Sequence, residues 1–288
     1  MKERDGYPWV LDEIAGRNNF EILRASTLAG GDINEVFQIT TAAGEKFAVK
    51  LNDPVKYPGM FLAEKTGLEA LRETKIFTVP KVLATGVIEN KAYLLLQYIN
   101  STSPVEDFWN VFGKKLADLH KKTNHLFGFD TDNYIGSLPQ KNGHCSTASE
   151  FYISQRLEPQ FRLAKSKGFK LGKTTALFNY CLEVIPDEPP SLIHGDLWSG
   201  NYLADSEGQP GLIDPAVSYA PRELDLAMMK LFGGFSPAAF ESYNFHFPLQ
   251  KDWEKRIPLW QLYYLLVHLN IFGAGYLARV TSIIDRYS

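Results

Sequence analysis

The sequence predicts an α+β protein with two lobes: a small antiparallel sheet with one main helix, followed by a larger and mostly helical lobe. Two observations predict this class. Runs of β-branched and aromatic residues with period-two alternation are concentrated in the first hundred residues. Apolar residues then recur at spacings of three and four through most of the remaining chain. The polar segment 100–104 separates the two patterns and places the boundary between lobes 1–99 and 100–288.

The first lobe begins with a short helix and continues as strands around one longer helix. The helices are expected at 7–18 and 60–73. The strands are expected at 36–40, 45–51, 82–88 and 92–99. In the second strand the period of two puts Phe47, Val49 and Leu51 on one face, and Ala48 and Lys50 on the other.

The second lobe is predicted to be helical apart from one β-rich interval. The interval covers 192–214, and the helices are expected at 108–119, 151–167, 174–185 and from 223 to the C-terminus. The most apolar stretch, 257–278, contains Gln261, His268 and Asn270. Polar groups are costly at bilayer depth, so a buried helix is expected there rather than a membrane span.

Composition excludes several classes of protein. With 288 residues, the chain has room for about two domains or one large one. It carries 30 basic and 33 acidic side chains, so it lacks the basic excess of a protein that neutralises nucleic-acid phosphates. Its 2 cysteines are far apart and form no CxxC motif, which argues against a disulfide framework or a four-ligand zinc site. The N-terminus is charged with no apolar segment after it, so we expect no signal peptide and a cytoplasmic protein. The charge balance and the polar residues within 257–278 lead us to expect no nucleic-acid or membrane partner.

The segment 193–201 and the Asp that follows it carry the strongest chemical signal. Phosphoryl transfer from ATP requires a group that orients the attacking hydroxyl, and oxygen ligands for Mg²⁺. Asp196, Asn201 and Asp214 meet this requirement in residue type, order and spacing, and Asp and Asn oxygens suit a hard cation. Each residue alone could belong to a polar loop with an Asx-turn, but the three together after an apolar strand indicate a kinase.

The first lobe supplies candidates for holding a nucleotide. Lys50 could grip phosphates, Ala48 two residues earlier leaves room for a flat adenine, and Glu64 on the next helix could pair with the lysine. Alone, Lys50 could be a solvated strand lysine and Glu64 an exposed helix carboxylate. The presence of Asp196, Asn201 and Asp214 later in the chain favours the interpretation in which Lys50 and Glu64 form a pair at a nucleotide site.

Two weaker candidates for nucleotide binding rest on position alone: a turn whose N–H groups could approach phosphate, and a hinge whose backbone could bind the adenine edge. These are Gly30, Gly31 and Asp32 for the turn, and Gln97, Tyr98 and Ile99 for the hinge.

The segment from His194 to Asn201, HGDLWSGN, resembles the signature of the fructosamine kinase (ketosamine-3-kinase) family. This family belongs to the aminoglycoside phosphotransferase and choline kinase branch of the protein-kinase-like fold. Trp198 is the discriminating position, since relatives in the branch commonly have another residue there. The resemblance covers nearly the whole chain, including the segments 30–34, 64–68, 128–140 and 155–157.

The resemblance implies ATP-dependent and Mg²⁺-dependent phosphorylation of the third-carbon hydroxyl of a ketosamine, free or on a glycated protein. The phosphorylated adduct is unstable, so the activity repairs glycated amines. Asp196 would be the catalytic base, and Asn201 and Asp214 would be the metal ligands. Lys50, positioned by Glu64, would bind the α and β phosphates. Trp198 would stack against the sugar or pack under the loop. A monomer is expected.

Further residues match the branch or depart from it. His194 is expected to hydrogen-bond and hold the loop, and Asp225 to brace it. Ala148 stands where the family usually has Trp, which concerns substrate preference. Two alternatives stay open: a kinase of another small molecule, such as an aminoglycoside or choline, and a nucleotide-binding pseudokinase scaffold. The joint presence of the five kinase residues speaks against the scaffold.

Overall fold

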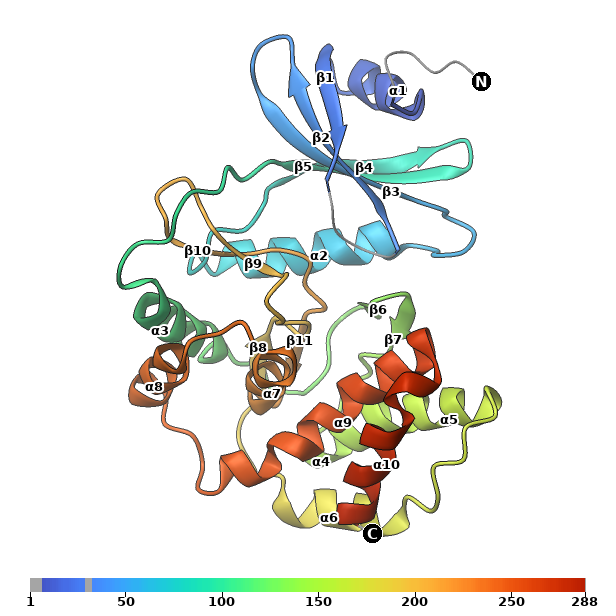
Figure 1. Cartoon of the computed structure of the whole chain (residues 1–288), viewed down its shortest axis with the longest axis vertical. Helices are drawn as coiled ribbons and strands as arrows, with labels where there is room; N and C mark the ends of the chain where they lie inside the picture. The colour runs from blue at the N-terminus through green and yellow to red at the C-terminus, as the bar shows by residue number, and fades with distance from the viewer. Residues whose placement is uncertain (1–6, 29–32, 288) are drawn as a thin grey trace.

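The computed structural model describes residues 7–28 and 33–287. Figure 1 shows a sheet-containing lobe above a larger helical lobe, with the chain passing from one to the other after strand β5. The predicted α+β class with two lobes is confirmed. The predicted glycine segment Gly30, Gly31 and Asp32 lies outside the described residues.

The upper lobe contains one five-stranded antiparallel sheet in the order β1-β2-β3-β5-β4. Its strands are β1 Ile22–Thr27, β2 Glu35–Thr41, β3 Lys46–Asn52, β4 Val82–Ile88 and β5 Lys91–Gln97. Four of these were predicted. β1 was missed because it is an edge strand with no fully buried residue, so it lacks the period-two alternation of apolar side chains on which the prediction depended.

Two helices cover opposite faces of this sheet. α1 (Val10–Arg17) packs against the face that carries Val49 and Leu51. α2 (Met60–Glu73) packs below the opposite face, as Figure 1 shows. The predicted alternation in β3 is therefore confirmed. Because α2 covers the second face, Lys50 is removed from solvent there and is only 6% exposed.

The lower lobe is mainly helical, and most of its predicted helices are confirmed. Its helices are α3 Phe108–His120, α4 Ala148–Phe151, α5 Glu158–Ser166, α6 Thr175–Val184, α7 Glu223–Phe232, α8 Pro237–His246, α9 Trp253–Phe272 and α10 Leu277–Arg286. The helix predicted at 151–167 differs, since α4 and α5 are joined by a π-helical turn, Tyr152–Leu157. A π-turn keeps the apolar spacing near that of an α-helix, so periodicity does not reveal it.

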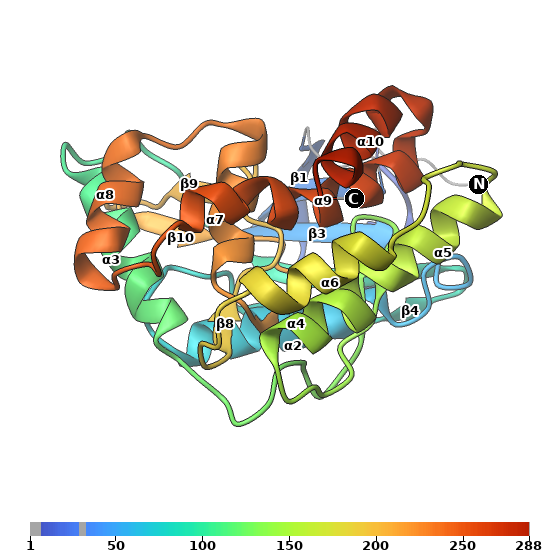
Figure 2. The ribbon, with the colours of Figure 1, turned by 90° about the horizontal axis from the view of Figure 1, so that it is seen from below.

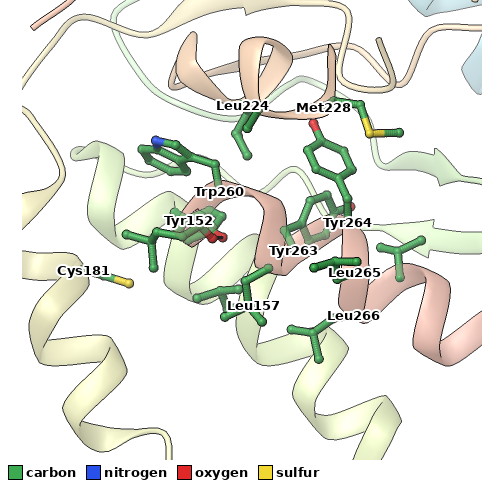
Figure 3. Packing of buried hydrophobic residues seen from close by; sticks show 14 of the residues in the cluster. Tyr152, Leu157, Cys181, Leu224, Met228, Trp260, Tyr263, Tyr264, Leu265 and Leu266 are labelled. Carbon is green, nitrogen blue, oxygen red and sulfur yellow. Dashed lines mark hydrogen bonds between the residues drawn. The ribbon is translucent and has the colours of Figure 1, made fainter. Parts of the chain in front are cut away.

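α9 is the central helix of the lower lobe, and Figure 2 shows it beside α10 and α7. Its side chains Trp260, Tyr263 and Tyr264 are buried among residues of α7 and the π-turn, as Figure 3 shows. The expectation of a buried helix within 257–278 is confirmed. Among the described residues, no helix is both long and apolar enough to cross a membrane.

Six short strands in the lower lobe form three antiparallel pairs: β6 Asn133–Ile135 with β7 Leu138–Gln140, β8 Ser191–Ile193 with β11 Ser218–Ala220, and β9 Tyr202–Ala204 with β10 Pro210–Leu212. The last two pairs bring the loop 194–201 beside Asp214. The N–H of Ile213 donates to the carbonyl of Asn201 at 3.0 Å, and that of Ala216 to the carbonyl of His194 at 2.9 Å.

Candidate active site

A cavity of about 1080 Å³ is lined by residues of both lobes. β3, β5 and α2 line it from above, and the loop 196–201, the segment after β10 and α9 line it from below. All described members of the predicted site contribute to its wall: Ala48, Lys50, Glu64, Gln97, Tyr98, Ile99, Asp196, Trp198, Asn201 and Asp214. Ala148 lies in the core of the lower lobe and not in this wall.

Lys50 joins the two lobes through two carboxylates. Its Nζ lies 2.7 Å from Oε1 of Glu64 on α2 and 2.5 Å from Oδ1 of Asp214. Burial alone would lower the pKa of Lys50, but the two neighbouring carboxylates outweigh it and raise the pKa above its usual value. The amine is therefore a fixed cation in the cavity. Burial also raises the pKa of Glu64, an effect that Lys50 opposes.

Asn201 connects the two aspartates of the lower lobe. Its Nδ2 donates to the carbonyl of Asp196 at 2.8 Å, and lies 3.3 Å from Oδ2 of Asp196 and 3.4 Å from the carbonyl of Asp214. These contacts use only the amide nitrogen. Within the described part of the chain, Oδ1 of Asn201 has no hydrogen-bond partner, so an oxygen remains available for a ligand beside Asp214.

Asp196 lies in an environment that disfavours its charged form. Burial raises its pKa to about 7, and the negative charges of Asp214 and Asp225 add to this effect. A carboxylate with a pKa near neutrality can exchange a proton with a substrate at physiological pH. The position and electrostatics of Asp196 therefore suit a general base.

The loop before Asp196 is held by a buried aspartate on α7. Asp225 accepts hydrogen bonds from the N–H groups of His194 and Gly195, both at 2.8 Å. The ring of His194 contacts the carbonyl of Ile213 through Nε2 at 2.9 Å, and burial lowers its pKa. Both expectations are confirmed: His194 holds the loop, and Asp225 braces it.

Gly195 and Asp214 both have left-handed backbone conformations, with φ of 82° and 54°. A Cβ atom on Gly195 would lie 2.1 Å from the carbonyl oxygen of Ala216, so only glycine fits there. The carbonyl of Gly195 also accepts a hydrogen bond from the hydroxyl of Tyr264 on α9, at 3.0 Å. Glycine adopts this conformation without strain, whereas Asp214 is a non-glycine residue at positive φ, and such residues concentrate at functional sites, where the surrounding contacts maintain them.

Sequence reasoning missed the network that holds the chain after Asp214. Asn133 on β6 donates from Nδ2 to the carbonyl of Val217 at 2.8 Å, and Gln140 on β7 donates to Oδ1 of Asn133 at 2.8 Å. The hydroxyl of Tyr263 on α9 donates to Oε1 of Gln140. The resemblance of the segment 128–140 marked this region, but the pattern alone did not assign these roles.

One end of the cavity is aromatic and was also missed. Its wall includes Phe232 from α7, and His268, Phe272 and Tyr276 from the end of α9 and the 3₁₀ turn Ala274–Tyr276 that follows. The last three are spaced by four residues, which would have placed them on one helical face. Trp198 is 42% exposed in the same wall, and its ring packs over Gly200.

Comparison with known proteins agrees with this geometry. Residues 10–288 match the model of the family described as fructosamine kinase. A protein of Enterococcus faecium with the name "probable ketoamine kinase" is 39% identical over 266 residues, which cover 90% of this chain and 94% of that protein. A chloroplastic protein-ribulosamine 3-kinase of Arabidopsis thaliana is 37% identical and covers 100% of this chain and 88% of its own length.

Solved structures agree on the fold. A structure described as a fructosamine-3-kinase of Haemophilus somnus superposes with a TM-score of 0.87 at 26% identity, over 96% of each chain. An amicoumacin kinase solved in complex with AMP-PNP, Ca²⁺ and Ami has a TM-score of 0.61 at 14% identity, over 96% of this chain and 92% of its own. This is a likeness of fold alone. The protein-kinase-like fold and the resemblance inferred from the sequence are confirmed. The chain belongs to the fructosamine kinase family and is a phosphotransferase that acts on a hydroxyl group.

Proposed function

We propose that this chain transfers the γ-phosphoryl group of ATP to the 3-hydroxyl of a ketosamine, either a small molecule or an adduct on a glycated protein. The observation that carries the proposal is one cavity in which Lys50, paired with Glu64, faces the group formed by Asp196, Asn201 and Asp214. The phosphorylated adduct would decompose and release the amine. The activity would therefore repair glycated amines.

The adenine is proposed to lie in the apolar part of the cavity. Ala48 and Leu96 line this part from the upper lobe, and Leu203 and Ile213 from the lower lobe. Within the described residues, the N–H of Ile99 donates to no protein acceptor, so it is available to the adenine edge. In this arrangement residues 1–99 would act as the nucleotide lobe and 100–288 as the substrate lobe.

The residues at the other side of the cavity fit a magnesium ion. Asn201 has a free Oδ1, and Asp214 uses only Oδ1 for Lys50, so both can offer an oxygen. Mg²⁺ typically takes one or two carboxylates and completes its shell with phosphates and water. When bound, the ion would neutralise charge that develops on the transferred phosphoryl group. Within the described chain, no cluster of three His, Cys, Asp or Glu side chains offers a competing all-protein metal site.

Asp196 is proposed to position the ketosamine and to accept the proton of its 3-hydroxyl. The bond from the hydroxyl oxygen to the γ-phosphorus forms as the bond from that phosphorus to the β,γ-bridging oxygen breaks, and ADP leaves. Lys50 holds the α and β phosphates during this step. Trp198, which is two residues from the base and lines the same cavity, is proposed to stack against the sugar.

We expect the wild-type protein to phosphorylate fructosamines or ribulosamines at least tenfold more efficiently, in kcat/KM, than choline or aminoglycosides, a modest preference by the usual differences between substrates. The measurement is ADP release across the four substrate classes at fixed Mg·ATP, with the phosphorylated product identified by mass. Turnover of choline or an aminoglycoside alone would contradict the proposed substrate. An absence of turnover with all four would contradict the proposed activity.

Replacing Lys50 should impair the use of ATP. In Lys50→Ala we expect kcat/KM for ATP to fall by about 10- to 100-fold, since one charge-assisted contact to phosphate contributes roughly 1.5–3 kcal/mol. Lys46→Ala is the matched control, because Lys46 lies on the same strand and is exposed. The measurement is the initial rate at varied ATP concentration. An unchanged kcat/KM for ATP in Lys50→Ala would contradict the proposal that Lys50 binds the phosphates.

A further inference from the structure

Four rings surround one end of the cavity. The ring centroid of His268 lies 4.9 Å from that of Phe232, 5.5 Å from that of Phe272 and 5.1 Å from that of Tyr276. In the described chain, four Phe or Trp side chains are exposed, and three of them, Trp198, Phe232 and Phe272, line this cavity. Exposed apolar rings gathered at one site indicate a binding surface rather than random surface composition.

The hydrogen bond of His268 fixes which ring nitrogen carries a hydrogen. Nδ1 lies 2.7 Å from the carbonyl oxygen of Tyr264, which can only accept, so Nδ1 carries the hydrogen. Burial lowers the pKa of His268, the hydrogen bond to the carbonyl of Tyr264 opposes this, and the positive charge of Arg279 on α10 adds to the lowering, so the net direction favours the neutral ring. Nε2 is then an acceptor, and no described residue donates to it.

The charged side chains in the cavity wall are mostly acidic. The charged side chains of the described wall are Lys50, Glu64, Asp196 and Asp214, and the lysine is bound by two of the three carboxylates. The aromatic end itself contributes ring faces, which attract cations, and one unpaired acceptor. It contributes no fixed positive charge to the wall, although Arg279 on α10, outside the wall, is near enough to lower the pKa of His268.

α9 places this end close to the proposed chemistry. Tyr264 contacts the carbonyl of Gly195, next to Asp196, and His268 lies one helical turn along α9 from Tyr264. In a ketosamine the amine is on the first carbon, two carbons from the 3-hydroxyl, and a secondary amine is protonated near neutral pH. A substrate whose hydroxyl meets Asp196 therefore has its ammonium group within a short distance of that hydroxyl.

We propose that His268 accepts a hydrogen bond from the protonated amine of the ketosamine, and that the rings of Phe232, Phe272 and Tyr276 bind the same cation. This inference rests on the proposed function, and it makes His268 a substrate-binding residue that distinguishes ketosamines from neutral sugars. The aromatic end would thus bind the amine of the substrate, while Asp196 binds its hydroxyl.

The test compares two substrates that differ in one atom: an N-alkyl ketosamine, and its ether analogue with oxygen in place of the amine nitrogen. Wild-type kcat/KM should favour the amine by about tenfold or more, the scale of one charge-assisted hydrogen bond. His268→Leu should abolish this preference by raising KM for the amine alone. His268→Gln should retain part of it, because the amide oxygen is also an acceptor.

The controls separate a binding role from a structural one. KM for ATP and kcat/KM for the ether should stay within about twofold in both His268 variants, and Mg·ATP should still raise their melting temperatures. Phe272→Leu should reduce the preference for the amine, whereas Phe245→Leu should not, since Phe245 is exposed on α8 outside the cavity wall.

Three outcomes contradict the inference, and only one of them also contradicts the proposed function. Equal wild-type use of amine and ether, or an equal loss of both in His268→Leu, would overturn the role of His268 and leave the ketosamine kinase intact. An absence of phosphorylation of either compound by wild-type protein would overturn the proposed function as well.

Discussion

Asp196→Asn should lower kcat for ketosamine phosphorylation by about 10³-fold, within the range that a positioned general base contributes. The amide of the variant cannot accept the hydroxyl proton. Its oxygen can still accept the hydrogen bond that Nδ2 of Asn201 donates to Oδ2 of Asp196 at 3.3 Å in the wild type. Because burial and two nearby aspartates disfavour the charged form of Asp196, the neutral amide should not destabilise the fold. The loss is therefore expected in catalysis rather than in stability.

Initial-rate assays and thermal unfolding together test this expectation. Mg·ATP should raise the melting temperature of Asp196→Asn as it does for the wild type, which shows that the nucleotide site is intact. Asp130→Asn is the matched control, since the side chain of Asp130 is 91% exposed. A kcat within about threefold of wild type in Asp196→Asn would contradict its role as base.

Asp225→Ala should reduce the free energy of unfolding by about 2–6 kcal/mol. The substitution removes the acceptor of two buried backbone N–H groups, those of His194 and Gly195, and each unsatisfied buried donor costs roughly 1–3 kcal/mol. It also removes the contact of Oδ2 with Nε2 of the buried His120, at 3.2 Å. Since these donors directly precede Asp196 in the loop 194–201, the substitution should also lower kinase activity.

Denaturant unfolding measures this effect, and the same exposed position gives the control. Asp130→Ala should change stability by less than about 0.5 kcal/mol, as exposed substitutions usually do. A loss below about 1 kcal/mol in Asp225→Ala would mean that the loop finds other acceptors, and that Asp225 does not brace it.

Periodicity predicted the elements whose two faces differ, and missed those whose faces do not. α2 matches its predicted bounds because Phe61, Leu68 and Leu71 form one buried stripe. β1 and the three-residue strands β6 and β7 have no such contrast over enough residues. Their pairing depends on neighbours that are distant in sequence, and one chain provides no signal for that.

The candidate site was predictable where its residues form a motif of fixed spacing. Asp196, Asn201 and Asp214 were found in this way, and the structure places them together with Lys50 and Glu64 around one cavity. The supporting residues were not found, because their contacts arise from tertiary packing. Gln140, for example, reaches Asn133 and the chain after Asp214 only once β7 is in place.

The most direct test of this account is the position of the phosphate on the product. We propose that wild-type protein with Mg·ATP and a ribulosamine labelled with ¹³C at the third carbon gives a phosphoester whose phosphorus couples, through the three bonds H–C–O–P, to the proton on that labelled carbon in NMR spectra. The signal should disappear as free amine is released, and it should not form with Asp196→Asn. Coupling of phosphorus to the protons of the fourth or fifth carbon instead, or ATP consumption without a sugar phosphoester, would contradict phosphorylation of the 3-hydroxyl by this cavity.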